Sequence, residues 1–138
     1  VIQSFEGEVV FTRDTHFENY ADTQEGKKLP IPHCIKGTNG WQINSKLKNL
    51  IKPETKIFDK ITFGSTELTE YLKNNKELEK VTLAGLCTDI CIISNALLIK
   101  ANLPEVEIEV LENCCAGVTP ESHINALNAM KMCQISVK

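Results

Sequence analysis

Short apolar runs rich in β-branched residues alternate with longer amphipathic stretches along this chain. Strands are predicted from composition or from a period of two over residues 8–14, 56–61, 80–86, 105–114 and 134–137. Helices are predicted from the spacing of apolar side chains over residues 66–75, 88–102 and 120–133. This alternation predicts a three-layer α/β/α fold around a mostly parallel sheet, in one domain spanning residues 1–138.

The first predicted strand begins within a few residues of Val1. In a doubly wound sheet the first strand and helix usually form a central unit, and no such unit precedes Glu8. We therefore expect an N-terminal strand and helix, about 30 residues, to belong to the protein upstream of this sequence.

Composition and charge exclude several classes of partner. The formal net charge is −3 and lysines are interleaved with acidic residues, so no basic face is available for nucleic acid. The most apolar run, residues 90–99, is much shorter than the roughly 20 residues that a membrane span requires. Six cysteines are present without a visible signal peptide or paired CxxC units. We expect a soluble protein with free thiols in a reducing cytoplasm.

The long connection over residues 12–43 collects side chains that can bind a metal. Asp14 and His16 follow the first strand and point to the same side by the period of two. Asp22, Glu25 and His33 come next. Two imidazoles with two or three carboxylates suit zinc, manganese or iron. The alternative is a solvated loop in which these acids are incidental.

The stretch GLCTDICIISNALL raises a separate hypothesis for Cys91. If Thr88 is the N-cap, Cys91 falls near the third position of a helix, where unpaired N–H groups and the helix dipole stabilise a thiolate. Strand-to-helix turns are also where ligands bind in open α/β sheets. The alternative is that Cys91 is a small core residue, which is the interpretation kept for Cys87, Cys114, Cys115 and Cys133. His123 is interpreted as a helix surface residue without a role.

Four segments together resemble the isochorismatase-like cysteine hydrolases, and most closely their metal-binding nicotinamidase or pyrazinamidase branch. These segments are TRDTH, EGKKLPIPHCIKGT, DKITF and AGLCTDICI, and they follow the order of the family across essentially the whole chain. The resemblance implies the same α/β fold with a parallel sheet between helices.

The resemblance implies a catalytic triad of Asp, Lys and Cys. Cys91 matches the nucleophile and Lys60 matches the lysine, while Lys56 lies four residues too early. The triad Asp normally ends a run similar to VVDMQNDF, which this sequence does not contain. We expect it in the N-terminal unit upstream; the alternative is a natively truncated, inactive chain. The backbone N–H groups of Cys87 and Cys91 are expected to form an oxyanion hole beside a cis peptide bond between Leu86 and Cys87.

For the metal, the resemblance assigns Asp14, His16 and His33 as ligands of a divalent ion. Family members differ in the remaining ligand, and the sequence here offers Glu25, with Asp22 as the substitute.

The implied activity is hydrolysis of a small carboxamide, such as nicotinamide to nicotinic acid and ammonia, through a thioester on Cys91. The segment before His33 lacks the aromatic residue that many nicotinamidases have, and Leu29 and Ile31 stand there instead. The alternatives are an isochorismatase-type or other C–N hydrolase of a different substrate, and a non-catalytic relative. The expected partners are the small amide and, as in many family members, further copies of the chain in a homo-oligomer.

Overall fold

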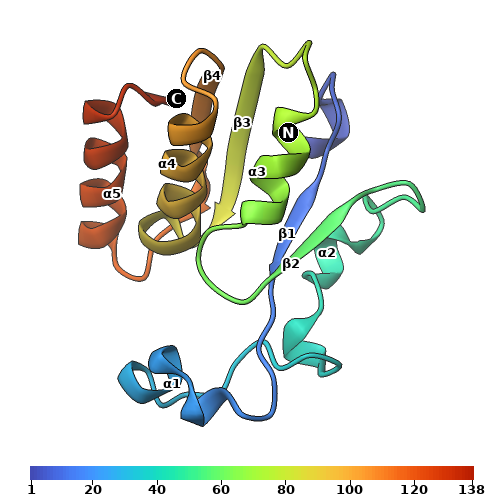
Figure 1. Cartoon of the computed structure of the whole chain (residues 1–138), viewed down its shortest axis with the longest axis vertical. Coiled ribbons are helices and arrows are strands. Elements are labelled where there is room, and N and C mark those ends of the chain that lie inside the picture. Colours follow the sequence, from blue (N-terminus) through green and yellow to red (C-terminus); the bar gives the residue numbers. More distant parts are fainter. The chain divides into compact units, whose positions relative to one another are not determined.

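All 138 residues, Val1–Lys138, are described by a computed structural model. The chain divides into two compact units, Val1–Thr62 and Phe63–Lys138 (Figure 1).

The first unit contains a parallel strand pair and several short helical turns. Its strands are β1 (Phe11–Asp14) and β2 (Ile57–Lys60), and its short α-helices are α1 (Gln24–Lys28) and α2 (Ser45–Lys48). Three 3₁₀ turns complete the unit: Ile2–Ser4, Tyr20–Asp22 and Asn39–Trp41. The long connection over residues 12–43 therefore contains local structure, in helical pieces of three to five residues each.

Register fixes which side chains meet at the ends of the two strands. β1 and β2 pair in parallel from Phe11 opposite Ile57 to Asp14 opposite Lys60. Beyond Asp14 the chain continues as an isolated parallel bridge between His16 and Ile35. The carboxyl ends of both strands and the returning loop thus meet at one edge of this unit.

The second unit is a three-stranded parallel sheet with three main helices. Its strands are β3 (Lys80–Leu86), β4 (Glu107–Ala116) and β5 (Ser136–Val137), in the order β3-β4-β5. The helices are α3 (Thr66–Lys73), α4 (Ile93–Asn102), which is preceded by a π-helical turn at Thr88–Ile92, and α5 (Pro120–Met132). In Figure 1 the three helices lie side by side along the sheet.

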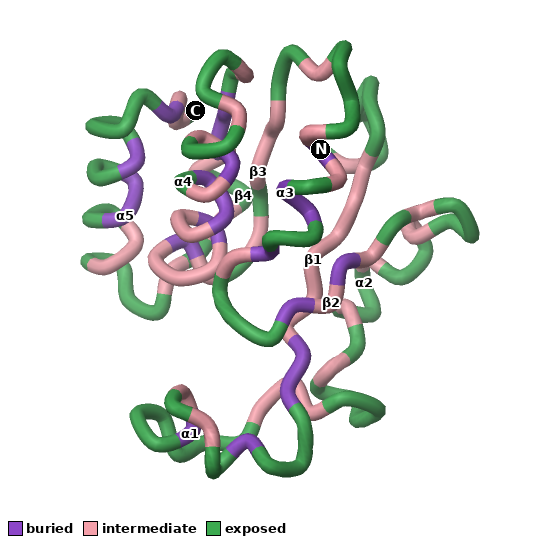
Figure 2. Tube along the Cα trace, viewed as in Figure 1, coloured by how far each residue is buried: buried purple, intermediate pink, exposed green.

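Apolar residues of these helices and strands form the core of the second unit. The buried apolar side chains come from α3, the π-helical turn, α4, β4, α5 and the segment before β5: Leu68, Leu72, Ile92, Ala96, Ile99, Ile108, Val110, Ala126, Leu127, Met130 and Ile135. Figure 2 shows buried positions recurring along α4 and α5 and in β4. Each helix therefore turns one apolar stripe toward the sheet or a neighbouring helix.

Local sequence explains where the helices begin. Ser65 accepts a hydrogen bond from Leu68 N at the start of α3. Thr119 and Ser122 form a reciprocal capping box at the start of α5, with Pro120 in the first turn. Both patterns satisfy N–H groups that a helix leaves unpaired at its start.

The predicted α/β class with parallel strands is confirmed, and all five strands and all three helices are present. The paired strands fall into two sheets, one in each unit, where the sequence predicted one. The prediction of one domain that continues upstream of Val1 stays a prediction. None of the helices combines the length and the apolar character that crossing a membrane requires.

One predicted detail is wrong. Thr88 is not the N-cap of the helix that carries Cys91: Cys87 occupies that position without a side-chain capping bond, and Thr88 is the first residue of the π-helical turn. The Thr88 hydroxyl is hydrogen-bonded elsewhere, to His123 Nδ1 at 2.7 Å. A long-range partner has replaced the local cap that the sequence suggested.

Candidate active site

In the first unit, Asp14, His16 and His33 gather at the carboxyl end of β1. Asp14 Oδ2 lies 3.4 Å from His16 Nε2 and 3.8 Å from His33 Nε2. His16 reaches this position because Asp14 and His16 are two residues apart in extended chain, as predicted. His33 is brought beside it by the bridge that pairs His16 with Ile35.

Glu25 supplies a fourth donor atom to the cluster. Its Oε1 lies 3.6 Å from His16 Nε2 and 3.6 Å from His33 Nε2. Glu25 is in the first turn of α1, where Thr23 caps the helix by accepting from the N–H of Gly26. Asp22, the substitute considered from sequence, is exposed in the preceding 3₁₀ turn.

The chemistry of these four side chains fits one divalent cation. With metal–ligand bonds of about 2.1 Å, a tetrahedral site spaces its ligand atoms roughly 3.4 Å apart. The four pairs between an imidazole nitrogen and a carboxylate oxygen are 3.4 to 3.8 Å apart, and the ligand atoms of Asp14, His16 and His33 all lie within 4.8 Å of one another. His16 Nε2 is buried and has no hydrogen-bond partner. A buried polar atom usually has a partner, and a bound metal ion would be a suitable partner for this nitrogen.

The tautomer of His33 is also suited to metal binding. Its Nδ1 lies 2.8 Å from the carbonyl oxygen of Ile31, which can only accept, so Nδ1 donates. In the neutral imidazole this leaves a lone pair on Nε2, the atom that faces Asp14 and Glu25.

Tyr20 packs behind both histidines. It is 2% exposed, and its ring meets those of His16 and His33 edge-on, with centroids 4.8 and 5.2 Å apart. The Tyr20 hydroxyl donates to Leu29 O at 2.9 Å. Burial, assisted by the negative charges of Glu25 and Asp14, raises the pKa of Tyr20 and keeps the hydroxyl protonated as a donor. Sequence reasoning assigned no role to this residue.

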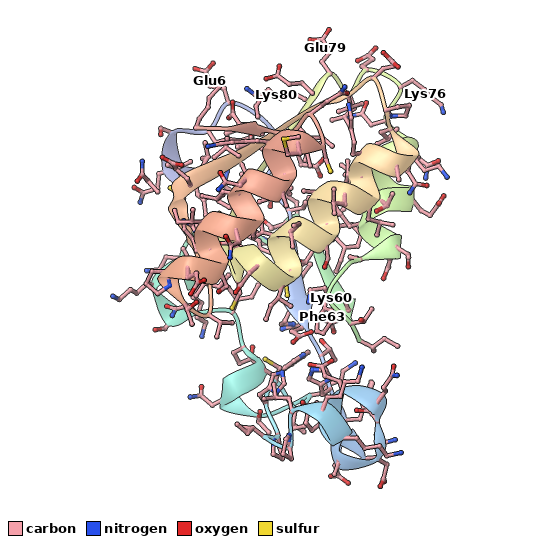
Figure 3. All side chains as sticks on the ribbon, turned by 90° about the vertical axis from the view of Figure 1, so that its left-hand side faces the viewer. Glu6, Lys60, Phe63, Lys76, Glu79 and Lys80 are labelled. Carbon is pink, nitrogen blue, oxygen red and sulfur yellow. The ribbon has the colours of Figure 1, made fainter.

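Lys60 extends the cluster from β2. Its side chain is buried, and its Nζ donates to Asp14 Oδ1 at 3.1 Å and to Thr62 O at 3.1 Å. Lys60 is labelled in Figure 3. Lys56, the competitor considered from sequence, is exposed before the strand begins. The predicted lysine is therefore hydrogen-bonded to Asp14, one of the candidate metal ligands.

Trp41 is already engaged within the first unit. The Arg13 guanidinium lies 3.5 Å from the centroid of the indole ring, and Trp41 Nε1 donates to Thr15 Oγ1 at 2.9 Å. Arg13 is held in turn by Asp59, with Nε 2.8 Å from Oδ1. One face of the only tryptophan is thus covered by a cation.

The second unit carries Cys91 and Cys87 at the end of β3. Cys91 lies in the π-helical turn Thr88–Ile92, and the peptide bond between Leu86 and Cys87 is cis, as predicted. Gly85, just before it, has a φ of 130°, a conformation that favours glycine. None of the six cysteines forms a disulfide. Burial raises the pKa of Cys87, with further contributions from Asp89 and Cys91.

Residues of α5 and of the loop before it hold the π-helical turn from one side. His123 Nδ1 is 2.7 Å from the hydroxyl of Thr88, a fully buried residue. Asp89 accepts from the N–H of Val118 through both carboxylate oxygens. Burial favours a higher pKa for Asp89, but hydrogen bonds from Ser122 and Val118 outweigh it and lower the pKa. His123, interpreted from sequence as a helix surface residue without a role, is half-buried, and its ring contacts the π-helical turn through Thr88.

The structure thus brings together Lys60 and the four predicted metal ligands in one unit, and Cys87 and Cys91 in the other.

Comparison with known proteins identifies the family. The isochorismatase domain matches residues 1–137. The isochorismatase family protein PncA of Bacillus subtilis is 31% identical over 128 residues, covering 87% of this chain and 68% of the relative. Isochorismatase family protein 2A of Dictyostelium discoideum is 31% identical over 91 residues, covering 64% of this chain and 42% of the relative.

Solved structures agree with this assignment. The nicotinamidase/pyrazinamidase PncA of Bacillus subtilis has a TM-score of 0.80 and 27% identity, over 94% of this chain and 74% of that one. The pyrazinamidase/nicotinamidase of Streptococcus mutans has a TM-score of 0.78 and 27% identity, over 95% of this chain and 75% of that one. The chain belongs to the isochorismatase family, and the predicted hydrolase class is confirmed.

Proposed function

We propose that this member of the isochorismatase family hydrolyses a small carboxamide, such as nicotinamide, to the acid and ammonia. The observation that carries the proposal is a cluster of possible metal ligands: the ligand atoms of Asp14, His16 and His33 lie within 4.8 Å of one another, and Glu25 Oε1 is 3.6 Å from both imidazoles. The similarity to two structures described as nicotinamidases supports this choice of substrate.

The same four residues are proposed to hold zinc, manganese or iron. Their two imidazoles and two carboxylates suit these borderline cations better than magnesium or calcium, which prefer oxygen ligands. When bound, such a cation supplies Lewis acidity to a water molecule or to a ring nitrogen of the substrate.

Cys91 is proposed as the nucleophile. Its thiolate sulfur attacks the carboxamide carbon, a C–S bond forms, and the carbonyl electron pair moves to oxygen. The backbone N–H groups of Cys87 and Cys91 are proposed to donate to that oxygen, and the family resemblance gives the Lys60 ammonium the role of stabilising the developing charge. The carbonyl then re-forms as the C–N bond breaks, and the nitrogen leaves as ammonia after accepting the proton that the Cys91 thiol gave up. Water cleaves the thioester, releasing the acid and restoring the thiol.

The residue that accepts the thiol proton is proposed to be the family Asp. Its VVDMQNDF-like run does not occur within residues 1–138, so its position upstream stays a prediction. The activity test therefore uses the complete product of the gene.

The test measures ammonia release from nicotinamide by purified, metal-analysed protein. We expect one equivalent of divalent metal, turnover of nicotinamide, and loss of both metal and turnover in His33→Ala. Cys91→Ser should keep the metal and lose turnover, while Cys133→Ser, which changes an exposed thiol, should retain both. Absence of bound metal and of ammonia release in the parent protein would contradict the proposal.

One observation favours a second substrate class. Leu29 and Ile31 are exposed before His33, and the Trp41 ring is covered by Arg13, so these three residues offer a less aromatic surface than a pyridine ring would favour. An isochorismatase-type or other C–N hydrolase acting on an aliphatic carbamoyl compound is the alternative. Turnover of that compound without turnover of nicotinamide would select it. Turnover of neither would support a non-catalytic relative.

A further inference from the structure

Asn95 is a buried amide one helical turn beyond Cys91. It lies in α4, is 5% exposed, and interrupts the most apolar run of the sequence. Its Nδ2 donates to Cys91 O at 2.7 Å and to Phe63 O at 3.1 Å. Its Oδ1 accepts from Ser65 N at 2.9 Å. Phe63 is labelled in Figure 3.

These partners fix the orientation of the amide. Phe63 O and Cys91 O can only accept, and Ser65 N can only donate, so both N–H groups and the oxygen of Asn95 are used. A buried amide without such partners would be costly, and asparagine is a poor helix former. Asn95 is therefore specified by what it binds and not by helix propensity or core packing.

The bond to Cys91 O lies where the helix changes its winding. Thr88–Ile92 is π-helical and α4 begins at Ile93, so Cys91 belongs to the wide turn. In that turn Ile92 N donates to Cys87 O, five residues back. Such π-helical turns are frequent at functional sites. The Asn95 side chain therefore links the carbonyl group of Cys91, in this π-helical turn, to the loop that precedes α3.

We propose that Asn95 is a positioning residue for Cys91. It holds the Cys91 backbone through the carbonyl oxygen and joins it to the loop at Phe63–Ser65, so that the thiol keeps its place at the start of the helix. The inference rests on the proposed function, because it takes Cys91 as the nucleophile.

α4 contains its own control for this role. Asn102 Nδ2 donates to Leu98 O at 2.9 Å, the same i to i−4 contact that Asn95 makes with Cys91. Asn102 is exposed and lies at the last turn of the helix. A general effect of asparagine on this helix would therefore be seen at both positions, and a positioning effect on Cys91 only at Asn95.

The experiment compares Asn95→Ala, Asn95→Ser and Asn102→Ala in the complete, metal-loaded protein. Nicotinamide turnover gives kcat and KM, and iodoacetamide labelling followed by peptide mass analysis gives the alkylation rate of Cys91. Because small misplacements of a reacting group cost about 100-fold, we expect Asn95→Ala to lower kcat by about that factor, with little change in KM. The Cys91 alkylation rate should fall by at least about fivefold, since reactivity follows the local environment of the thiol.

Asn95→Ser supplies the rescue. A serine hydroxyl in a helix can donate to the carbonyl four residues back, so this variant keeps the contact with Cys91 O and loses those with the loop. We expect kcat and alkylation rate between those of the parent and Asn95→Ala, and no change in Asn102→Ala. Circular dichroism and thermal melting identify the folded fraction, and rates are compared per folded molecule.

The outcomes separate the two proposals. Unchanged kcat and an unchanged Cys91 alkylation rate in folded Asn95→Ala would overturn the positioning role. A lower melting temperature with both rates unchanged per folded molecule would overturn it as well. If Asn95→Ala does not fold, the same comparison is made between Asn95→Ser and the parent protein, and equal rates there overturn the role. If the parent protein does not hydrolyse nicotinamide, the proposed function fails, while Cys91 alkylation still decides the role of Asn95.

Discussion

Lys60 and Asp14 lie opposite each other at the end of the parallel pair β1 and β2, and Lys60 Nζ donates to Asp14 Oδ1 at 3.1 Å. The other oxygen, Asp14 Oδ2, is the one that faces His16 at 3.4 Å. The two oxygens of one carboxylate thus have different partners, one a buried ammonium and the other the candidate metal ligands. This division means that the charge of Lys60 can be removed without removing a ligand.

We predict that Lys60→Met strongly lowers turnover but does not remove metal binding. The substitution removes the ammonium proposed to stabilise the developing charge, an effect worth a factor of at least about 100 in kcat, and leaves all four donor side chains in place. Metal content and ammonia release are measured on the same preparation. Lys56→Met, at the exposed lysine before β2, is the control and should keep both. Loss of metal in Lys60→Met would show that the lysine acts on the cluster itself.

Gly26→Ala should weaken metal binding. A Cβ at Gly26 would overlap the carbonyl oxygen of Tyr20, a backbone atom that cannot rotate away, so α1 must shift and carry Glu25 with it. Overpacking of this kind costs about 1–3 kcal/mol, and displaced ligands typically lose about 10–100-fold in metal affinity. Titration with zinc against a chromophoric chelator measures the change.

Gly40→Ala is the matched control for this prediction. The nearest atom to a Cβ there is Thr38 Oγ1 at 3.9 Å, an ordinary contact. This variant should bind zinc as the parent protein does. Equal zinc affinities in Gly26→Ala and the parent protein would mean that the close packing of α1 against Tyr20 does not position Glu25.

The metal side of the candidate site was predictable because its signals are local in sequence. The period of two placed Asp14 and His16 on one side, and the motif order supplied His33 and Lys60. Glu25 was preferred over Asp22 through the family resemblance, and the structure places it 3.6 Å from both histidines. Helix and strand positions followed from apolar periodicity, because the spacing of apolar residues within one segment shows which of its faces is buried.

The surroundings of Cys91 were not predictable in the same way. Thr88 has the residue type of an N-cap, but its hydroxyl is used by His123, 35 positions along the chain. Asn95 reads as an interruption of an apolar helix, and its role depends on Phe63 and Ser65 in a distant loop. Propensity describes neighbours within a few residues, so partners that tertiary packing supplies leave no comparable signal in a single sequence.

Among the six thiols, Cys91 should be alkylated fastest at neutral pH. Burial raises the pKa of Cys87, and burial likewise raises the pKa of Cys115, so both hold less of the reactive thiolate. Cys91 lies in the π-helical turn Thr88–Ile92 at the start of the helical segment and is the proposed nucleophile. Iodoacetamide labelling resolved by peptide gives the order. Equal labelling of Cys91 and Cys87 would contradict an activated nucleophile.

Glu109 should make the stability of the protein sensitive to acid. It is a buried carboxylate on β4, 2.6 Å from Lys138 Nζ and 2.8 Å from Lys80 Nζ, and these hydrogen bonds lower its pKa below the ordinary value of 4.5. Lys80 is labelled in Figure 3. Because the pKa is lower in the folded state than in the unfolded state, the stabilisation is complete above about pH 4.5 and is lost as the pH falls through the folded value.

Glu109→Gln should therefore flatten the acid limb of the stability curve. It removes the titrating carboxylate and two charged hydrogen bonds, which lowers the free energy of unfolding near pH 7 by about 1.5–3 kcal/mol. Below about pH 4 the free energies of unfolding of the variant and the parent protein should become more similar. Urea unfolding between pH 3 and 8 measures both effects. Glu107→Gln is the control, because Glu107 lies on the same strand but is half exposed and 3.6 Å from Lys80 Nζ, a geometry in which an ion pair contributes about 0–1 kcal/mol. Parallel curves for Glu109→Gln and the parent protein would show that the acid sensitivity arises from other carboxylates.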